Sequence, residues 1–207
     1  LGVRFPPGSP KTMHMKLSEL QQQIINCKKC KRLIAFRKKI IINKKKQFEM
    51  EHYWGKPTPG FGNINANIII FGLAPAAHGA TRTGRVFTGD KSGDLLYRSL
   101  FKAGLSNQAE SNNIKDDLQL SCYITNVLKC VPPEDKPTMT ELNNCSSFLE
   151  RELSLLSKAK VFITIGQVAF KEILKFYKQK YSLPKTIIFK HGAKYNMPDN
   201  KILISSY

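Results

Sequence analysis

Short, continuous apolar runs recur along this chain and are typical of strands that are buried within a sheet. Residues 67–71 read Asn-Ile-Ile-Ile-Phe and are followed by Gly72, while residues 161–165 read Val-Phe-Ile-Thr-Ile. Two more apolar runs of similar length lie at residues 122–125 and 201–205. We therefore predict four strands at these positions.

Longer stretches with the spacing of amphipathic helices separate these runs. A first short helix is expected to open at Ser18 and to lead to Cys27, because Leu17, Leu20, Ile24 and Ile25 fall on one side of it. A Thr138-x-x-Glu141 capping box marks the start of a later helix. The helices predicted between the strands cover residues 92–103, which end before Gly104, residues 138 to about 157, and residues 167–178.

Strands that alternate with helices predict an α/β fold with a mostly parallel central sheet and helices on both faces. We expect one domain at 15–207, preceded by a Pro- and Gly-rich segment, 1–14, that we interpret as a tag or disordered lead-in. Ligands of such sheets bind beyond the carboxyl ends of the strands. The segments in which to expect a site begin at Gly72, Asn126, Gly166 and Ser205.

The charge of the chain changes this picture by indicating a polyanionic partner. It has 33 Lys and Arg against 15 Asp and Glu, a formal net charge of +18. Residues 28–46 contain ten basic residues and no acidic one, interleaved with apolar residues such as Leu33, Phe36 and Ile40. We interpret this segment as a basic arm that contacts nucleic acid. The alternative is a solvated lysine-rich surface without a specific partner.

The cellular compartment is predicted from two features that are not visible in the sequence, a membrane-spanning stretch and a signal peptide. No apolar stretch reaches the roughly 20 residues that a membrane-spanning helix needs, and no signal peptide is visible. We expect a soluble, cytoplasmic monomer that makes no contact with a membrane.

Four cysteines, Cys27, Cys30, Cys130 and Cys145, form the pattern of a metal site. The first two are a CxxC pair, and the other two can join them if the fold brings distant segments together. Four thiolates suit a tetrahedral zinc ion or an iron–sulfur cluster, and the spacing does not choose between them. Disulfides or inert core thiols are the alternative, which a reducing compartment disfavours. Cys122 lies in an apolar run, so we expect it in the core rather than among the ligands.

The loop after the first predicted strand reads Gly72-Leu73-Ala74-Pro-Ala-Ala-His78-Gly79. It matches neither the dinucleotide GxGxxG motif nor the phosphate-binding GxxxxGK[ST] motif, so we do not expect a nucleotide cofactor. Its glycines and alanines would let the backbone approach a flat ligand closely. Such a loop could bind the edge of a base.

Longer motifs around this loop resemble those of the family 5 uracil-DNA glycosylases. The resemblance covers about residues 27–207, and it implies the uracil-DNA-glycosylase fold and a DNA repair enzyme that hydrolyses the bond between uracil and its sugar. The motifs that carry it are Tyr53-Trp-Gly-x-Pro-x-Pro-Gly-Phe-Gly62, Gly72-Leu-Ala-Pro-Ala-Ala-His-Gly-Ala80, Arg82-Thr-Gly-Arg85, Phe87-Thr-Gly-Asp90 and Ile124-Thr-Asn-Val-x-Lys-Cys130.

The resemblance also implies roles for individual residues. Phe87 matches the aromatic residue that stacks on the extruded base, and Asn126 matches the asparagine that reads the base edge and stabilises the departing base. Gly72, Leu73 and Ala74 are expected to line the base pocket. Without the resemblance, Phe87 could equally be a core anchor and Asn126 could satisfy a turn.

The first motif departs from that of related families, which carry an acidic or amide residue there. Leu73 and Ala74 stand in this motif instead, so no carboxylate in it can activate water. We expect Asn126 and backbone N–H groups to stabilise the leaving group, and other polar groups to position water. His78 is a candidate acid or base, although a histidine in a glycine-containing loop can also be structural.

The resemblance bears on the cofactor and on the end of the chain. It implies that Cys27, Cys30, Cys130 and Cys145 hold a [4Fe–4S] cluster. It also implies a His-Pro-Ser motif after the last strand; the sequence stops at Tyr207, so we expect the native protein to continue.

Family 5 enzymes are associated with deaminated purines as well as uracil, and a small pocket beside Ala74 is compatible with this. The competing hypotheses are a non-catalytic, metal-clasped nucleic-acid-binding protein and a zinc-dependent nucleotide hydrolase.

Overall fold

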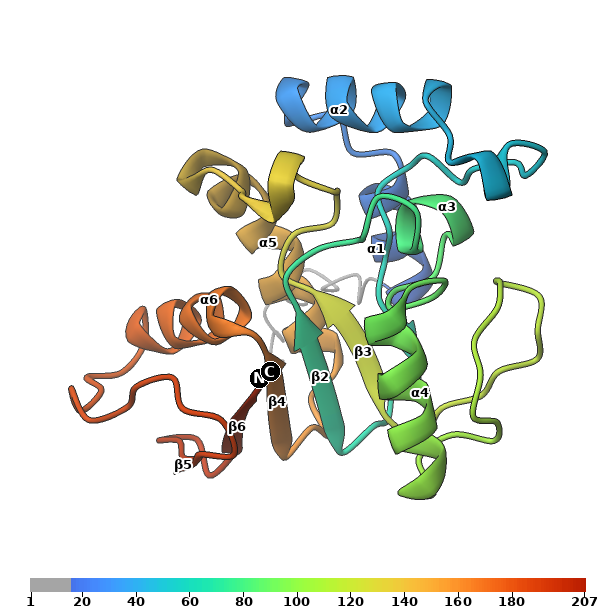
Figure 1. Cartoon of the computed structure of the whole chain (residues 1–207). Coiled ribbons are helices and arrows are strands. Elements are labelled where there is room, and N and C mark those ends of the chain that lie inside the picture. The colour runs from blue at the N-terminus through green and yellow to red at the C-terminus, as the bar shows by residue number, and fades with distance from the viewer. Residues whose placement is uncertain (1–15) are drawn as a thin grey trace, which may run out of the picture.

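The computed structural model describes residues 16–207, so the predicted lead-in at 1–14 lies outside the described residues. Its centre is a six-stranded sheet with the strand order β1-β3-β2-β4-β6-β5 (Figure 1). The four inner strands run parallel, and each edge strand pairs antiparallel with its neighbour. The predicted α/β class and mostly parallel sheet are confirmed.

The four predicted strands form the middle of this sheet, each within about one residue of its expected bounds. The two edge strands are short and were not predicted. The strands are β1 (Phe61–Gly62), β2 (Ile68–Gly72), β3 (Tyr123–Asn126), β4 (Val161–Ile165), β5 (Lys194–Asn196) and β6 (Ile202–Ser206).

Six α-helices surround the sheet among residues 16–207. They are α1 (Leu17–Ile25), α2 (Lys31–Ile42), α3 (Ala80–Thr83), α4 (Lys91–Lys102), α5 (Met139–Leu155) and α6 (Gln167–Lys178), with short 3₁₀ turns at Lys46–Phe48 and Pro133–Asp135. The capping box of α5 is confirmed, since Thr138 Oγ1 accepts from Glu141 N–H and the Glu141 carboxylate accepts from Thr138 N–H. The first helix begins one residue earlier than predicted, at Leu17.

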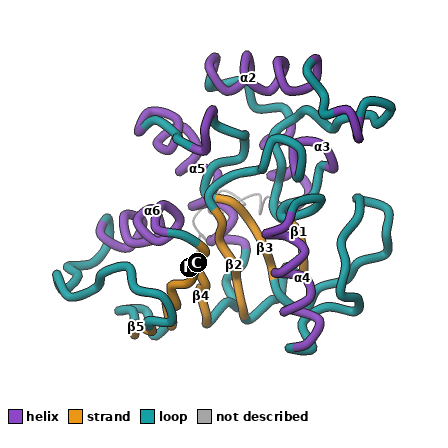
Figure 2. The backbone as a smooth tube through the Cα atoms, viewed as in Figure 1, coloured by secondary structure: helices purple, strands orange, loops and turns teal. Residues whose placement is uncertain are grey.

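Helices cover both faces of the sheet, as the alternation of side chains along each strand requires. On one face, Ile69 and Phe71 of β2 pack in a core with residues of α5 and α6. On the other face, Ile70 packs with Tyr97 and Leu100 of α4. The tube view shows the same layers, with the helices flanking the strands (Figure 2).

Helix α2 was not predicted: within the basic segment, Lys31–Ile42 are helical. Its buried positions are Leu33, Arg37 and Ile40, which lie on one side of a helix because they are four and three residues apart. The helical pattern was not recognised in the sequence because Arg37 occupies the middle position of this otherwise apolar stripe. The other charged residues of this helix are exposed.

The edge strand β1 is formed by the last two residues of the Pro- and Gly-rich segment 53–62. Gly62 allows this pairing, since a Cβ there would lie 2.2 Å from the carbonyl oxygen of Cys122, which directly precedes β3.

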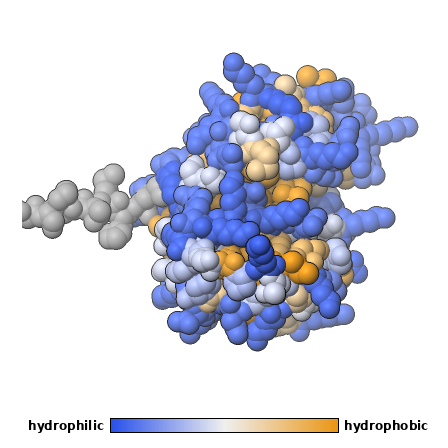
Figure 3. All heavy atoms as spheres, turned by 90° about the vertical axis from the view of Figure 1, so that its left-hand side faces the viewer, coloured by the Kyte–Doolittle hydropathy of each residue, from blue (hydrophilic) through white to orange (hydrophobic). Residues whose placement is uncertain are grey.

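The face shown in Figure 3 is mainly hydrophilic, with scattered apolar side chains. Within residues 16–207, none of the helices combines the length and the apolar character needed to cross a membrane.

Candidate active site and cysteine cluster

The first candidate site lies where β2 and β3 end. These strands are parallel neighbours, and Gly72 is the register partner of Asn126. Because both strands run in the same direction, the loops that follow them leave the sheet at one edge. The backbone then stays paired, since Val127 N–H donates to Gly72 O and Leu128 N–H donates to Leu73 O. The start of the 72–79 loop is thereby fixed beside Asn126.

Asn126 is 1% exposed, and its Oδ1 atom has no hydrogen-bond partner in residues 16–207. Only one other buried side-chain atom of the described residues shares this property, Thr58 Oγ1. Burying an amide oxygen without a partner costs about 1–3 kcal/mol. A partner that enters from outside the chain would remove this cost, so the unpaired oxygen indicates a ligand.

The ring of Phe87 lies next to Gly72 at the end of β2, as the Asn126 side chain does. A Cβ on Gly72 would be 2.5 Å from Phe87 Cζ and also 2.5 Å from Asn126 Oδ1. The glycine therefore lets an aromatic ring and an amide approach one another over the end of β2. Three of the five residues predicted for the base pocket, Gly72, Phe87 and Asn126, come together in the structure. The other two, Leu73 and Ala74, are partly buried and pack against the core on the α5 and α6 side of the sheet.

Phe87 has a backbone φ of +53°, in the left-handed region that residues with a side chain rarely adopt. Its neighbours hold it there: Tyr97 Oη donates to Val86 O at 2.9 Å, and Thr88 Oγ1 lies 2.7 Å from Ser111 Oγ. Gly93 of α4 packs so closely that a Cβ would be 1.7 Å from Phe87 O. A strained backbone kept by so many contacts indicates that the ring has to stand in one place.

A buried ion pair extends this support into the segment between α4 and β3. Arg85 Nη1 donates to the carboxylate of Asp116 and to Ser111 Oγ at 3.0 Å. Burial alone would raise the pKa of Asp116, but hydrogen bonds from Arg85 and from two backbone N–H groups hold it below its ordinary value. The sequence offered no signal for this pair, because its members are 31 residues apart.

His78 makes local contacts within the loop. Its Nδ1 atom lies 2.9 Å from the hydroxyl of Tyr53, and its carbonyl oxygen accepts from Arg82 Nε at 2.7 Å. Burial lowers the pKa of His78, and the positive charges of Lys45 and Arg82 lower it further. The ring is therefore favoured in its neutral form. These contacts fit the structural interpretation of His78 better than that of a free acid.

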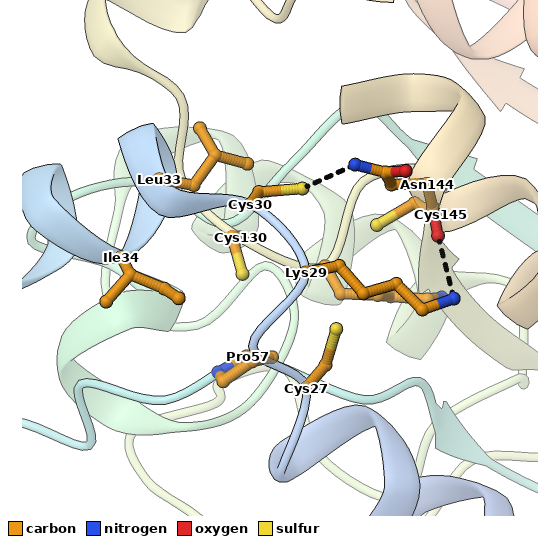
Figure 4. Close-up of a pocket in the computed structure, with 10 residues that line it drawn as sticks. Cys27, Lys29, Cys30, Leu33, Ile34, Pro57, Cys130, Asn144 and Cys145 are labelled. Carbon is orange, nitrogen blue, oxygen red and sulfur yellow. Dashed lines mark hydrogen bonds between the residues drawn. The ribbon is translucent and has the colours of Figure 1, made fainter. Parts of the chain in front are cut away.

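The second candidate site is the cysteine group. Cys27, Cys30, Cys130 and Cys145 border one cavity, and their sulfur atoms point toward its middle (Figure 4). They come from the turn between α1 and α2, the segment after β3, and α5. The fifth cysteine, Cys122, is fully buried in the core on the α4 side of the sheet.

Two side chains donate hydrogen bonds to these sulfurs. Arg37 Nη1 lies 3.1 Å from Cys130 Sγ, and Asn144 Nδ2 lies 3.4 Å from Cys30 Sγ. Burial nevertheless raises the pKa of Cys130 to about 12 and that of Cys145 to about 11, so both thiols favour the protonated state at neutral pH. A bound metal centre would supply the positive charge that stabilises their thiolate forms.

The spacing of possible metal ligands bears on the two kinds of centre that the sequence left open, a zinc ion and an iron–sulfur cluster. In residues 16–207, no three His, Cys, Asp or Glu side chains lie close enough to share one metal ion. A single zinc ion needs such an arrangement, whereas a cubane cluster binds each thiolate at a different iron and so accepts a wider spacing. The four cysteines border one cavity, so they offer a donor set for a centre that takes four thiolates.

A buried network of hydrogen bonds links the strand that carries Asn126 to the helix that carries Cys145. Lys129 Nζ donates to Thr125 Oγ1 and to Glu152 Oε2, both at 2.6 Å, and Lys129 and Glu152 are almost completely buried. Thr125 precedes Asn126 on β3, and Glu152 lies on α5, which also carries Cys145. Sequence analysis missed Lys129 and Glu152, because a lone lysine and a lone glutamate give no sign of their burial.

Comparisons with known proteins give a consistent result. The family model of the uracil DNA glycosylase superfamily matches residues 59–206. The chain is 43% identical to the type-5 uracil-DNA glycosylase of Thermus thermophilus, over 90% of this chain and 83% of that protein. It is 38% identical to the type-5 uracil-DNA glycosylase of Pyrobaculum aerophilum, over 88% of this chain and 78% of that protein. It is 29% identical to the type-4 uracil-DNA glycosylase of Sulfurisphaera tokodaii, over 80% of this chain and 61% of that protein.

Proposed function

The chain belongs to the uracil DNA glycosylase superfamily, on its type-5 branch, and we propose that it excises uracil from DNA at the pocket formed by Gly72, Phe87 and Asn126. It is an enzyme that acts on N-glycosyl bonds in DNA, and its product is an abasic site. The observation that carries the assignment of the pocket is the buried, unpaired Oδ1 atom of Asn126.

Uracil in a duplex must leave the base stack before its bond to the sugar can be reached. Phe87 provides an aromatic face on which the extruded base stacks. Asn126 Oδ1 accepts a hydrogen bond from the ring N–H of uracil, and its amide group donates to a uracil carbonyl. This pairing satisfies the oxygen that is otherwise without a partner.

Breaking the bond leaves negative charge on the base and positive charge on the sugar. The amide of Asn126 stabilises the negative charge, and its hydrogen bond strengthens as that charge develops. Leu73 and Ala74 offer no side chain that could remove a proton from water. The enzyme therefore depends mainly on stabilising the leaving group, and polar groups outside the first motif position the water.

The four cysteines Cys27, Cys30, Cys130 and Cys145 hold a [4Fe–4S] cluster in this proposal. The support is the cavity that all four border and the hydrogen bond that Arg37 gives to Cys130. The cluster supplies cross-links between segments rather than a step of the reaction. By joining α5 to the turn before α2, it fixes the basic helix beside the pocket loops.

Excision of uracil by the full-length protein is the direct test. The protein is incubated with a duplex that carries one uracil opposite guanine, and free uracil and alkali-labile abasic sites are measured. We expect stoichiometric release of both, and none from a duplex with cytosine at that position. A non-catalytic nucleic-acid-binding protein would bind both duplexes and release no base. Hypoxanthine and xanthine in the same position test whether deaminated purines are also substrates.

A further inference from the structure

Lys129 and Glu152 form the most completely buried ion pair among residues 16–207. Their side chains are 1% and 0% exposed, and Lys129 Nζ lies 2.6 Å from Glu152 Oε2. Taking two charges out of water costs several kcal/mol for each ion, and a pair of apolar residues of similar volume often gives an equally stable fold. Stability alone is therefore a weak explanation of this pair.

The pair is bound to one face of β3. Thr125 Oγ1 accepts from Lys129 Nζ at 2.6 Å and donates to the Glu152 carboxylate at 3.1 Å. Tyr123 Oη donates to the same carboxylate at 3.5 Å. Because side chains alternate along a strand, Tyr123 and Thr125 face α5, and Asn126 faces the opposite side. Fixing Thr125 therefore sets the direction in which the Asn126 side chain leaves the strand.

The end of β3 has a strand neighbour on one side only. Strand β2 pairs with all four residues of β3, whereas β1 pairs only with Tyr123 and Ile124. Thr125 and Asn126 therefore receive less support from the sheet than the two residues before them. The hydrogen bonds from the buried pair reach β3 at this less supported end.

The main chain at Lys129 is held on two sides. Its carbonyl oxygen accepts from Thr58 N–H at 2.8 Å, and the N–H of the preceding residue, Leu128, donates to Leu73 O at 2.9 Å. Lys129 also borders the cavity of the cysteine group, and Cys130 follows it directly. A lysine that is anchored in this way is a rigid support for Thr125.

We propose that Lys129 is a positioning residue for uracil excision. Its ammonium group, held by Glu152, fixes Thr125 and thereby the direction of the Asn126 amide. A positioned group loses much of its effect on a reaction when it is displaced by about 1 Å. Lys129 acts only through Thr125 and Asn126, from the face of β3 opposite the base. The inference rests on the proposed function, because that function gives Asn126 its role.

Thr125→Val tests the link between the ion pair and the strand. Valine keeps the shape of the side chain and removes the hydroxyl, so the fold should persist while Asn126 loses its fixed direction. We expect the maximal single-turnover rate of uracil excision to fall about tenfold, while the DNA concentration that gives half of this rate stays within about twofold of wild type. Thr125→Ser keeps the hydroxyl and should restore most of the rate.

Thr164→Val is the matched control. Thr164 lies on β4, is as completely buried as Thr125, and donates its hydroxyl to Ile204 O at 3.2 Å. Its replacement should cost stability, as Thr125→Val does, but leave the maximal rate of excision unchanged. Equal maximal rates for the two valine variants would overturn the positioning role.

The double variant Lys129→Met/Glu152→Gln tests the ion pair itself. Both charges are removed together, so neither is left buried without a partner, and the new amide oxygen can still accept from Thr125. Measured at a temperature where both proteins are folded, its maximal rate should be about tenfold below that of wild type. A wild-type rate in this folded variant would contradict the proposal.

Adding Thr125→Val to Asn126→Ala shows whether the effect passes through Asn126. In this background the added change should lower the rate by less than about twofold, because no amide remains to be misdirected. A further loss of about tenfold would mean that Thr125 supports the site by another route, and would overturn the proposal. If the wild-type protein releases no uracil, the proposed function fails instead, so the two failures are distinguishable.

Discussion

Arg37 differs from the other basic residues of the segment 28–46 because its side chain is buried and points at a sulfur. Only 9% of it is exposed, and its guanidinium donates to Cys130 Sγ. A hydrogen bond that involves a charged group contributes more than a neutral one. The residue therefore serves the cysteine group rather than DNA.

Replacing Arg37 tests this distinction. Arg37→Gln should lower the free energy of unfolding by about 1.5–3 kcal/mol and hasten loss of the visible absorbance of the proposed cluster in the presence of a chelator. Lys38→Gln removes the same charge from the exposed side of the helix and should do neither. Denaturant titration and absorbance decay measure the two effects. Equal behaviour of the two variants would contradict a special role for Arg37.

Sequence reasoning worked unevenly at the scale of single residues. The motifs identified Asn126 and Phe87, and the structure brings both to Gly72. The strained backbone of Phe87 could not be predicted, because it depends on the close approach of Gly93 and on the bond between Thr88 and Ser111, which no local sequence pattern indicates. The burial of Arg37 was hidden because its neighbours in the sequence are exposed lysines.

The segment between α4 and β3 acts as a brace for the loop that carries Phe87. Its Ser111 and Asp116 bind Thr88 and Arg85, which flank Phe87 on either side. A side chain that must stack on a base gains from such support, because small displacements of a positioned group reduce its effect.

Asp116→Asn tests the brace. It removes the charge that pairs with the buried Arg85 and should lower the free energy of unfolding by about 1.5–3 kcal/mol at neutral pH. The pKa of Asp116 in the folded state is below its ordinary value of 3.8, so this contribution is complete above that value and is lost as the pH falls through the lower pKa. The difference between wild type and variant should therefore shrink below about pH 4 in denaturant titrations.

Asp117, the exposed neighbour of Asp116, offers a control. Asp117→Asn changes the same charge without removing an ion pair seen in residues 16–207, and it should leave stability nearly unchanged. If Asp116→Asn and Asp117→Asn have the same effect at neutral pH, the buried pair is not what stabilises this segment.

Whole elements were predicted best where their patterns were long or continuous. The strand β2 is a continuous apolar run, β4 is interrupted only by Thr164, and α5 begins with a capping box. The edge strands β1 and β5 have two and three residues, too few for any periodicity to show. Helix α2 was missed because Arg37 interrupts its apolar stripe.

At the scale of the whole molecule, the cysteine group joins parts of the chain that the sheet does not connect. Cys27 and Cys30 flank the turn between α1 and α2, Cys130 follows β3, and Cys145 lies on α5. A centre bound to all four would couple the basic helix to the strand that carries Asn126. The mostly parallel character of the sheet could be predicted from the alternation of strands and helices, but this convergence is a property of the folded chain.

Cys130→Ser tests whether the cysteine group binds the proposed cluster. Loss of one thiolate should reduce iron and sulfide content, bleach the visible absorbance and lower the melting temperature, because the remaining cysteines surround an incomplete centre. Cys122→Ser is the control, since Cys122 lies on the other side of the sheet; it should keep the iron content of the wild type. A colourless wild-type protein with one zinc per chain would contradict the cluster.

The central claim is that Asn126 reads uracil and stabilises it as it leaves. Single-turnover excision from a uracil-containing duplex by Asn126→Ala tests this most directly, with Asn65→Ala, in an exposed turn, as the matched control. We expect the rate of Asn126→Ala to fall by about 10²–10³-fold, the usual cost of losing one donor to a developing anion, with unchanged affinity for undamaged duplex. The control should excise at the wild-type rate. Excision by Asn126→Ala at the wild-type rate would contradict the account, because the base would then be released without its proposed partner.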